Sequence, residues 1–185
     1  MRMQGVVVVG VCSAIVGVWA ANGGSEEQRS APPSPASTAI MCHADEPGRR
    51  LLMSGVVTDE QGRPIEGASV CVHNADARGL YNPPSSPMRV PRIHATVVTD
   101  ALGRFQLLTV RPGPYPDGSE PAHVHFDVTA PAYRQKYVTI WTEGDPLITP
   151  ERRARAERDD ELRIVPVRSI DGLDAVHVDI ALAES

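Results

Sequence analysis

Short apolar segments separated by turn sequences constrain the fold of this chain more than any other feature. Residues typical of strands fill Leu51–Thr58, Ala68–His73 and Arg104–Val110. Beside them lie two turn sequences, Asp59–Gly62 and Asp100–Gly103. A content of 17 prolines and only 4% aromatic residues suits short strands joined by defined turns better than long helices.

Later segments continue this pattern. Further strand-like stretches are Thr96–Thr99, His123–Thr129, Tyr137–Trp141, Arg163–Val167 and Val176–Leu182. Together the segments predict an all-β fold, a single antiparallel β-sandwich with long loops and at most one or two short helices. We expect each of the two turn sequences to join its flanking strands as a hairpin.

Two segments interrupt the strand pattern. Asp76–Arg92 is rich in proline and contains Tyr81, and long loops of this kind are often functional. Pro150–Arg158 has helix-forming residues and mixed charges but no apolar stripe. We therefore expect a short exposed helix there, with its charges forming a solvated face.

The N-terminus has the pattern of a secretory signal peptide. Arg2 precedes an apolar run from Gly5 to Ala20, and small residues favour cleavage after Ala20. The chain then divides into a signal peptide (1–20), a flexible linker rich in Gly, Ser and Pro (21–40) and a β-sandwich domain (41–185). This predicts a secreted or periplasmic protein. The alternative is a protein that keeps this segment as an N-terminal membrane anchor.

Cysteine and charge content limit the environment and the partners. With Cys12 inside the signal peptide, Cys42 and Cys71 remain, and an oxidising compartment permits a disulfide between them. Two separate thiols are the alternative, because sequence gives no distance between these residues. The net charge is −5 and no basic run is present, which argues against nucleic-acid binding.

Two histidines share one face of a predicted strand. Side chains alternate along a strand, so His123 and His125 point to one side while Val124 and Phe126 point to the other. One face can then bind a metal while the opposite face lies in a core. On the residues alone, incidental histidines and a packed corner tyrosine at Tyr115 are competing interpretations.

Three motifs in order resemble a known enzyme family. They are Gly79-Leu80-Tyr81, Arg111-Pro112-Gly113-Pro114-Tyr115-Pro116 and Pro121-Ala122-His123-Val124-His125-Phe126. In this context they resemble the intradiol ring-cleavage dioxygenases over roughly Leu51 to Leu182, including catechol 1,2-dioxygenases and the iron-bearing subunits of protocatechuate 3,4-dioxygenases. The frame around the first turn also resembles carboxypeptidase regulatory-like and transthyretin-like modules, which mostly bind rather than catalyse.

The resemblance to the dioxygenases implies a metal site and a reaction. Tyr81, Tyr115, His123 and His125 would hold one Fe(III) per chain. Tyr115 would be displaced by the substrate and take up a proton as it leaves. A catechol and O2 would react so that the ring opens between the two hydroxylated carbons, giving a muconate-type diacid. We therefore expect an exported dioxygenase.

Two positions depart from the family pattern. Glu120 stands where relatives usually have an arginine, and Thr139 where they commonly have a glutamine. A carboxylate beside an anionic substrate repels it, so we expect a preference for neutral or cationic catechols. A replacement positive charge could come from Arg78, Arg111 or Arg134.

These departures keep other functions open. One is a non-catalytic extracellular β-sandwich that binds or assists, or a catalytically impaired relative. Another is a site that holds zinc with the same ligands. The chain lacks a helical N-terminal region like the dimerisation element of catechol 1,2-dioxygenases, and its oligomeric state stays open, with a homo-oligomer among the options.

Overall fold

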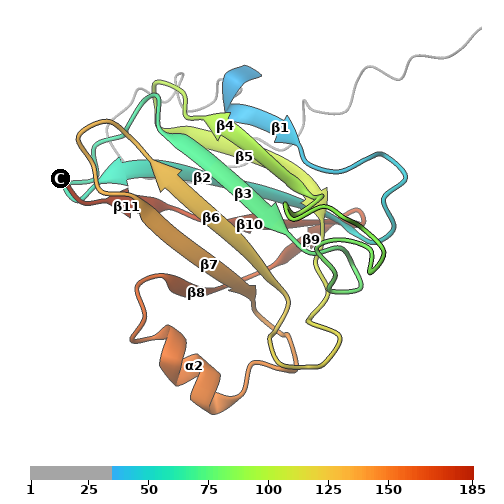
Figure 1. Ribbon diagram of the computed structural model, residues 1–185. Helices are drawn as coiled ribbons and strands as arrows, with labels where there is room; N and C mark the ends of the chain where they lie inside the picture. The colour runs from blue at the N-terminus through green and yellow to red at the C-terminus, as the bar shows by residue number, and fades with distance from the viewer. Residues whose placement is uncertain (1–34) are drawn as a thin grey trace, which may run out of the picture. The chain divides into compact units, whose positions relative to one another are not determined.

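Two β-sheets and the core between them make up the described part of the chain (Figure 1). The structure is a computed structural model and describes residues 35–185, which belong to one unit, Pro33–Ser185. These residues form strands, one short 3-10 helix, η1 (Pro35–Ser37), and one α-helix, α2 (Pro150–Ala156). The mainly β prediction with one or two short helices is confirmed for this part of the chain.

The first sheet is built around β2, the longest strand. Its members in spatial order are β1 (Thr38–Ile40), β5 (Arg104–Val110), β2 (Arg50–Asp59), β10 (Leu173–His177) and β9 (Arg168–Ile170). Beyond β10, the last strand β11 (Ile180–Leu182) pairs with the final residues of β2.

The second sheet contains the strand with the two histidines. Its members in spatial order are β4 (His94–Val98), β3 (Ser69–Asn74), β6 (His123–Thr129), β7 (Lys136–Thr142) and β8 (Leu162–Val165). Helix α2 lies beside β8, at the edge of this sheet (Figure 1). The histidine strand β6 is therefore the central strand, held on both sides.

Strand alternation creates the core between the sheets. Every second residue of β2 and β3 is buried, as a strand with one face in the interior requires. Phe105 of the first sheet and Phe126 of the second meet with ring centroids 6.1 Å apart. Val124, Phe126 and Val128 are buried as predicted, and each such side chain stabilises the fold by about 1.5–3 kcal/mol.

The sheets are mixed, which corrects the antiparallel prediction. β1 runs parallel to β5, β10 and β11 run parallel to β2, and β8 runs parallel to β7. Strands with such long connections can return in either direction, and alternation of side chains carries no information on that direction.

Both predicted hairpins are wrong. β2 and β3 lie in different sheets, and so do β4 and β5. The turn at Asp59 closes only a short ladder, with Thr58 opposite Pro64, before the chain crosses to the second sheet. Turn residues fix where the chain reverses, but they do not fix which strand pairs with which.

The N-terminal boundary needs one correction. Thr38–Ile40, placed at the end of the predicted linker, pairs with β5 as strand β1. Its backbone groups supply the bonds, so three residues without a clear apolar period can still form an edge strand. The predicted signal peptide and the anchor alternative lie outside the described residues. No helix among residues 35–185 is long and apolar enough to cross a membrane.

The two described cysteines are separate thiols. Cys42 and Cys71 are both free and partly buried. The Cys42 sulfur accepts a hydrogen bond from the Arg50 guanidinium at 3.3 Å, whereas Cys71 lies within β3. The structure therefore has the alternative arrangement and no disulfide between this pair.

Candidate metal centre

The histidines lie on the outer face of the second sheet. His123 and His125 occupy the same side of β6, with ring centroids 4.8 Å apart, opposite the buried Val124. The loops that follow β3 and β5 cover this face, so His123 is only 5% exposed. The predicted division of β6 into a face with both histidines and a core face is confirmed.

Two loops bring tyrosines to these histidines. We call residues 75–93, between β3 and β4, the Tyr81 loop, and residues 111–122, between β5 and β6, the Tyr115 loop. The Tyr81 hydroxyl lies 3.0 Å from His123 Nε2 and 3.5 Å from the Tyr115 hydroxyl. The Tyr115 and His123 ring centroids are 4.9 Å apart. All four predicted ligands are therefore neighbours.

Backbone and side-chain acceptors orient the two imidazoles. His123 Nδ1 lies 2.6 Å from the Pro121 carbonyl, which can only accept, so this nitrogen carries the proton. His125 Nδ1 lies 3.0 Å from the Thr139 hydroxyl, one strand away. The Nε2 atom of His123 therefore keeps a lone pair for a metal, and that of His125 does so when its Nδ1 donates to the Thr139 hydroxyl.

Burial keeps two of the candidate ligands, Tyr81 and His125, neutral in the absence of a cation. Burial, together with the neighbouring Tyr115 hydroxyl, raises the pKa of Tyr81 far above its ordinary value. Burial, followed by the neighbouring His123 and His73, lowers the pKa of His125 to about 4. His125 is thus a neutral imidazole at neutral pH, and Tyr81 ionises only beside a strong positive charge.

The donor set fits a ferric ion. Two adjacent ligands about 2.1 Å from one ion lie about 3 Å apart, as the Tyr81 hydroxyl and His123 Nε2 do. Within residues 35–185, no group of three or more His, Cys, Asp or Glu side chains could hold a metal. A metal held by these four side chains would have two phenol oxygens among its ligands, and phenolates with imidazoles suit a hard, highly charged iron.

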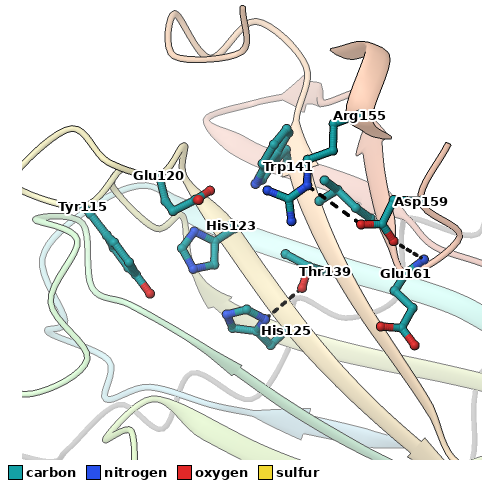
Figure 2. Close-up of a pocket in the computed structure, with 10 residues that line it drawn as sticks. Tyr115, Glu120, His123, His125, Thr139, Trp141, Arg155, Asp159 and Glu161 are labelled. Atoms are coloured by element: carbon teal, nitrogen blue, oxygen red, sulfur yellow. Dashed lines mark hydrogen bonds and ion pairs between the residues drawn. The ribbon is translucent and has the colours of Figure 1, made fainter. Parts of the chain in front are cut away.

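A cavity of about 280 Å³ opens beside the candidate ligands (Figure 2). Tyr115, His123 and His125 form part of its wall, and both departing positions, Glu120 and Thr139, line it. The remaining lining residues are Trp141, Arg155, Asp159, Glu161 and Leu162. The cavity is therefore a space in which a small ligand can meet the predicted site residues.

The segment from α2 to β8 supplies a charged wall that the sequence did not reveal. Arg155 and Asp159 lie 3.9 Å apart and both line the cavity. The helix itself has no buried residue and the Arg155 side chain is 60% exposed, as expected for a short exposed helix. Thr149 caps the helix by accepting from the Arg152 amide. Figure 2 shows Arg155 approaching from the side opposite Tyr115.

The arginines that we expected to replace the missing charge are engaged elsewhere. Arg78 pairs with Asp76 at 3.1 Å and Arg111 with Asp174 at 3.1 Å. Arg134 donates to the Glu184 carbonyl. The guanidinium in the cavity wall is instead that of Arg155.

His73 was also missed as a neighbour of the site. It stands opposite His125 in the β3–β6 register, with ring centroids 4.8 Å apart, and lies 5.9 Å from the Tyr81 ring. Burial, followed by His123 and His94, lowers its pKa, so it is neutral at neutral pH. Alternation along the predicted strand places His73 on the same face as Cys71. The sequence did not show that this strand pairs with the histidine strand β6.

Known proteins resemble this chain in sequence. The sequence family described as Dioxygenase (Dioxygenase_C) matches residues 27–180. The protocatechuate 3,4-dioxygenase beta chain of Burkholderia cepacia is 34% identical over 112 residues, covering 55% of this chain and 48% of that protein. The chlorocatechol 1,2-dioxygenase of Rhodococcus opacus is 30% identical over 147 residues, covering 69% and 56%. This chain thus spans about half the length of these relatives.

Solved structures agree with the fold. Catechol 1,2-dioxygenase of Acinetobacter radioresistens superposes with a TM-score of 0.66 at 25% identity, over 80% of this chain and 57% of that one. The dioxygenase domain of a carbohydrate-binding fusion from Streptomyces sp. SirexAA-E has a TM-score of 0.63 at 24% identity, over 82% and 92%. With most of its length matched by the family, this chain belongs to the intradiol ring-cleavage dioxygenases.

Proposed function

We propose that this protein is a non-haem Fe(III) dioxygenase that cleaves a catechol ring between its two hydroxylated carbons. The observation that carries the proposal is the convergence of two tyrosines and two histidines beside a cavity of about 280 Å³. The substrate class comes from the relatives, which are catechol, chlorocatechol and protocatechuate dioxygenases.

The protein's own groups have distinct tasks in this proposal. Tyr81, Tyr115, His123 and His125 would hold the iron, and the Pro121 carbonyl and the Thr139 hydroxyl keep the imidazoles turned toward it. Bound ferric iron would supply a Lewis acid that favours the ionised catechol and makes it reactive toward dioxygen. Tyr115, which lines the cavity, would accept a proton from the arriving substrate.

The overall reaction balances without another reagent. The bond between the two hydroxylated carbons breaks, and both atoms of O2 enter the product. Each of these carbons becomes a carboxyl carbon, so catechol plus O2 gives one muconate-type diacid. The protein's acid–base work is therefore limited to moving protons between the substrate hydroxyls and groups such as Tyr115.

The cavity wall supports a preference for neutral or cationic catechols. Glu120, Asp159 and Glu161 contribute three carboxylates, against the single guanidinium of Arg155. A ring carrying its own carboxylate meets net repulsion there, while a protonated amine on the ring meets attraction. Partial exposure and salt weaken both effects.

Iron reconstitution followed by oxygen uptake tests the proposal. We expect the ferric protein to be coloured by a phenolate charge-transfer band and to consume one O2 per catechol. Tyr81→Phe should change or remove the band. Tyr137→Phe is the matched control, because this exposed tyrosine on β7 lies outside the site and should leave colour and activity unchanged.

The alternatives give different results in the same experiment. A coloured protein that binds catechols without oxygen uptake would indicate a binding module or an impaired relative. A protein that stays colourless with iron but binds zinc tightly would contradict the ferric proposal.

We also propose that the protein is exported. The apolar run from Gly5 to Ala20 and the small residues at its end support cleavage after Ala20. Expression of the full chain in a secreting bacterial host should yield a mature protein that begins at Ala21 by N-terminal sequencing. Recovery of the intact chain in the membrane fraction would favour the anchor instead.

A further inference from the structure

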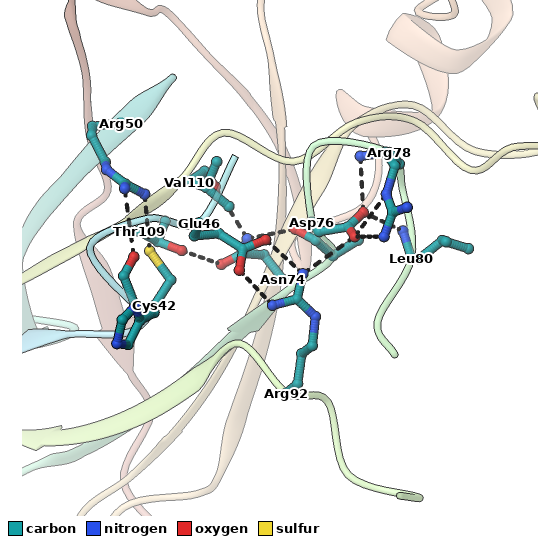
Figure 3. A network of polar contacts seen from close by, with 12 residues as sticks. Cys42, Glu46, Arg50, Asn74, Asp76, Arg78, Leu80, Arg92, Thr109 and Val110 are labelled. Atoms are coloured by element: carbon teal, nitrogen blue, oxygen red, sulfur yellow. Dashed lines mark hydrogen bonds and ion pairs between the residues drawn. The ribbon is translucent and has the colours of Figure 1, made fainter. Parts of the chain in front are cut away.

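The buried carboxylate of Asp76 lies at the start of the Tyr81 loop, at the centre of a polar network (Figure 3). Its side chain is 4% exposed. Oδ1 accepts from the backbone amides of Arg78 and Leu80 at 2.8 and 3.0 Å. Oδ2 accepts from the guanidinium groups of Arg78 and Arg92 at 3.1 and 3.2 Å. One carboxylate thus fixes the turn that leads directly into Tyr81.

The backbone of Asp76 connects this turn to the other tyrosine loop. Its carbonyl accepts from the amide of Gly79 within the turn and from the amide of Gly113 in the Tyr115 loop, both at 2.9 Å. Its own amide donates to the Leu80 carbonyl at 2.9 Å. Asp76 is therefore bonded both to the residue before Tyr81 and to a residue two positions before Tyr115.

Two glycines let the loops approach backbone to backbone. A Cβ atom on Gly79 would lie 1.8 Å from the Pro114 carbonyl oxygen, and one on Gly113 would lie 2.4 Å from the Ala77 carbonyl oxygen. Such distances are far below contact separation, so no other residue fits at either position without moving a loop. The two tyrosine loops are consequently packed as one unit around Asp76.

A second contact holds the far end of the Tyr81 loop in the same unit. Arg92 donates to both Glu46 oxygens at 2.6 Å as well as to Asp76, and its amide donates to the Tyr81 carbonyl. Bidentate pairs of this kind are geometrically specific and partly buried here. Asp76, before Tyr81 in the sequence, and Arg92, after it, thus hold the two ends of the Tyr81 loop.

We propose that Asp76 is a positioning residue that sets the separation of the Tyr81 and Tyr115 hydroxyls by joining their loops. This inference rests on the proposed function only in taking those hydroxyls to be metal ligands. The hydroxyls are 3.5 Å apart, close enough to share one ion. Burial alone raises the pKa of Asp76, but the Leu80 and Arg78 amides and the two guanidiniums outweigh it and leave the pKa below its ordinary value.

The chain provides a matched control for Asp76. The sequence Asp-x-x-Gly occurs as the same turn at Asp59, Asp76 and Asp100, each with a bond from the glycine amide to the aspartate carbonyl. Asp100 also accepts from the amides two and four residues later, at 2.9 Å each. Of these three turns, only the one at Asp76 bonds to the Tyr115 loop, so Asp100 shows what loss of the aspartate does to such a turn by itself.

The test compares Asp76→Asn with Asp100→Asn in the full chain. Amide hydrogen exchange is measured on the metal-free protein, and iron affinity and the phenolate band are measured after reconstitution. For Asp76→Asn we expect at least tenfold faster exchange at both Leu80 and Gly113. Iron affinity should fall by about 10–100-fold with a shifted band. For Asp100→Asn we expect faster exchange only in its own turn, with iron affinity and band as in the wild type.

Three other results have definite meanings. Faster exchange confined to Leu80, with Gly113 and the band unchanged, would overturn the positioning role. If Asp76→Asn does not fold, Arg92→Gln replaces it, since it removes one guanidinium from the Asp76 carboxylate and leaves the carboxylate with its bonds from the Arg78 and Leu80 amides. An unchanged phenolate band and iron affinity in that variant, together with unchanged exchange at Gly113, would overturn the role. A wild-type protein without any band would contradict the iron proposal, while the exchange result would still decide whether Asp76 joins the loops.

Discussion

At the scale of single residues, Thr139 and Glu120 are the two positions at which we expect this protein to depart from its family. Thr139 stands where a longer side chain is common in the family, yet its hydroxyl lies 3.0 Å from His125 Nδ1. The substitution therefore keeps an orienting group for the imidazole. Glu120 also lines the cavity, and within residues 35–185 its side chain has no hydrogen bond or ion pair of this kind.

Replacing Thr139 by valine should weaken metal binding. Valine keeps the shape of the side chain but removes the hydroxyl that fixes the His125 ring, so iron affinity should fall by about 10–100-fold. Thr139→Ser keeps the hydroxyl and should retain most of the affinity. Equilibrium competition with a chelator measures both variants. Equal affinities for the valine and serine variants would mean that this hydroxyl does not orient the ring.

Removing the charge of Glu120 should change the order of substrate preference. With Glu120→Gln, kcat/KM for a carboxylated catechol should rise about three- to tenfold relative to unsubstituted catechol, since about 1 kcal/mol of repulsion is removed. The ratio should depend less on salt than in the wild type. Glu184→Gln, at an exposed site near the C-terminus, is the control. An unchanged ratio would show that Glu120 does not select substrates.

At the scale of elements, the tyrosine loops and the turns show what sequence can and cannot predict. Strand positions were mostly predicted because alternation is local, and β6 (His123–Thr129) matches its predicted bounds. Strand partners were not, because both predicted hairpins cross between sheets. The cavity wall from Arg155 to Leu162 was missed for the same reason. Only the parallel pairing of β7 with β8 brings Leu162 opposite Thr139.

The site ligands were predicted by family resemblance rather than by spacing. Nothing local to Tyr81 or Tyr115 distinguishes a metal ligand from a packed tyrosine. The Asp76 turn, in contrast, was readable, since its Asp-x-x-Gly pattern matches the two turns that were predicted. What could not be read was the contact of Gly79 and Gly113 across loops, which depends on the fold of both sheets.

Alanine at Gly79 should cost far more than alanine at Gly67. Both glycines have a left-handed φ, +80° and +77°, so each substitution carries a backbone cost of about 1 kcal/mol. Only Gly79 also faces a backbone atom, the Pro114 carbonyl, and this adds about 1–3 kcal/mol. Urea unfolding of the two variants measures the difference. Equal losses would show that the Tyr115 loop moves away at little cost.

At the scale of the whole molecule, Asp174 connects segments that are far apart in the sequence. It is fully buried in β10 and pairs with Arg49 at 2.7 Å and with Arg111 at 3.1 Å. Burial alone raises its pKa, but the Ser169 hydroxyl and the two arginines outweigh it, so the pKa lies below its ordinary value. Asp174 therefore links the first sheet's last strands to segments that flank β2 and β5.

Stability should fall in acid through this residue. A carboxyl with a lowered folded-state pKa stabilises the fold fully above its unfolded value of about 3.9, and this stability is lost as pH falls through the folded value. The free energy of unfolding from urea titrations should thus decrease from about pH 5 downward. Asp174→Asn should be less stable at pH 7 and should show a shallower decrease. Parallel curves would assign the acid sensitivity to other carboxylates.

The pairing of β2 with the final strands has a consequence for how the protein is made. Ser54 and its neighbour His177 are 123 residues apart, and β11 completes β2 only at Leu182. Contacts so distant along the chain slow folding, because a large loop must close before they form. The central strand of the first sheet thus stays half-paired until β10 and β11 have been synthesised. A chain that folds this late stays unfolded for longer than one that folds from its N-terminus. An unfolded chain can pass through a narrow translocation pore.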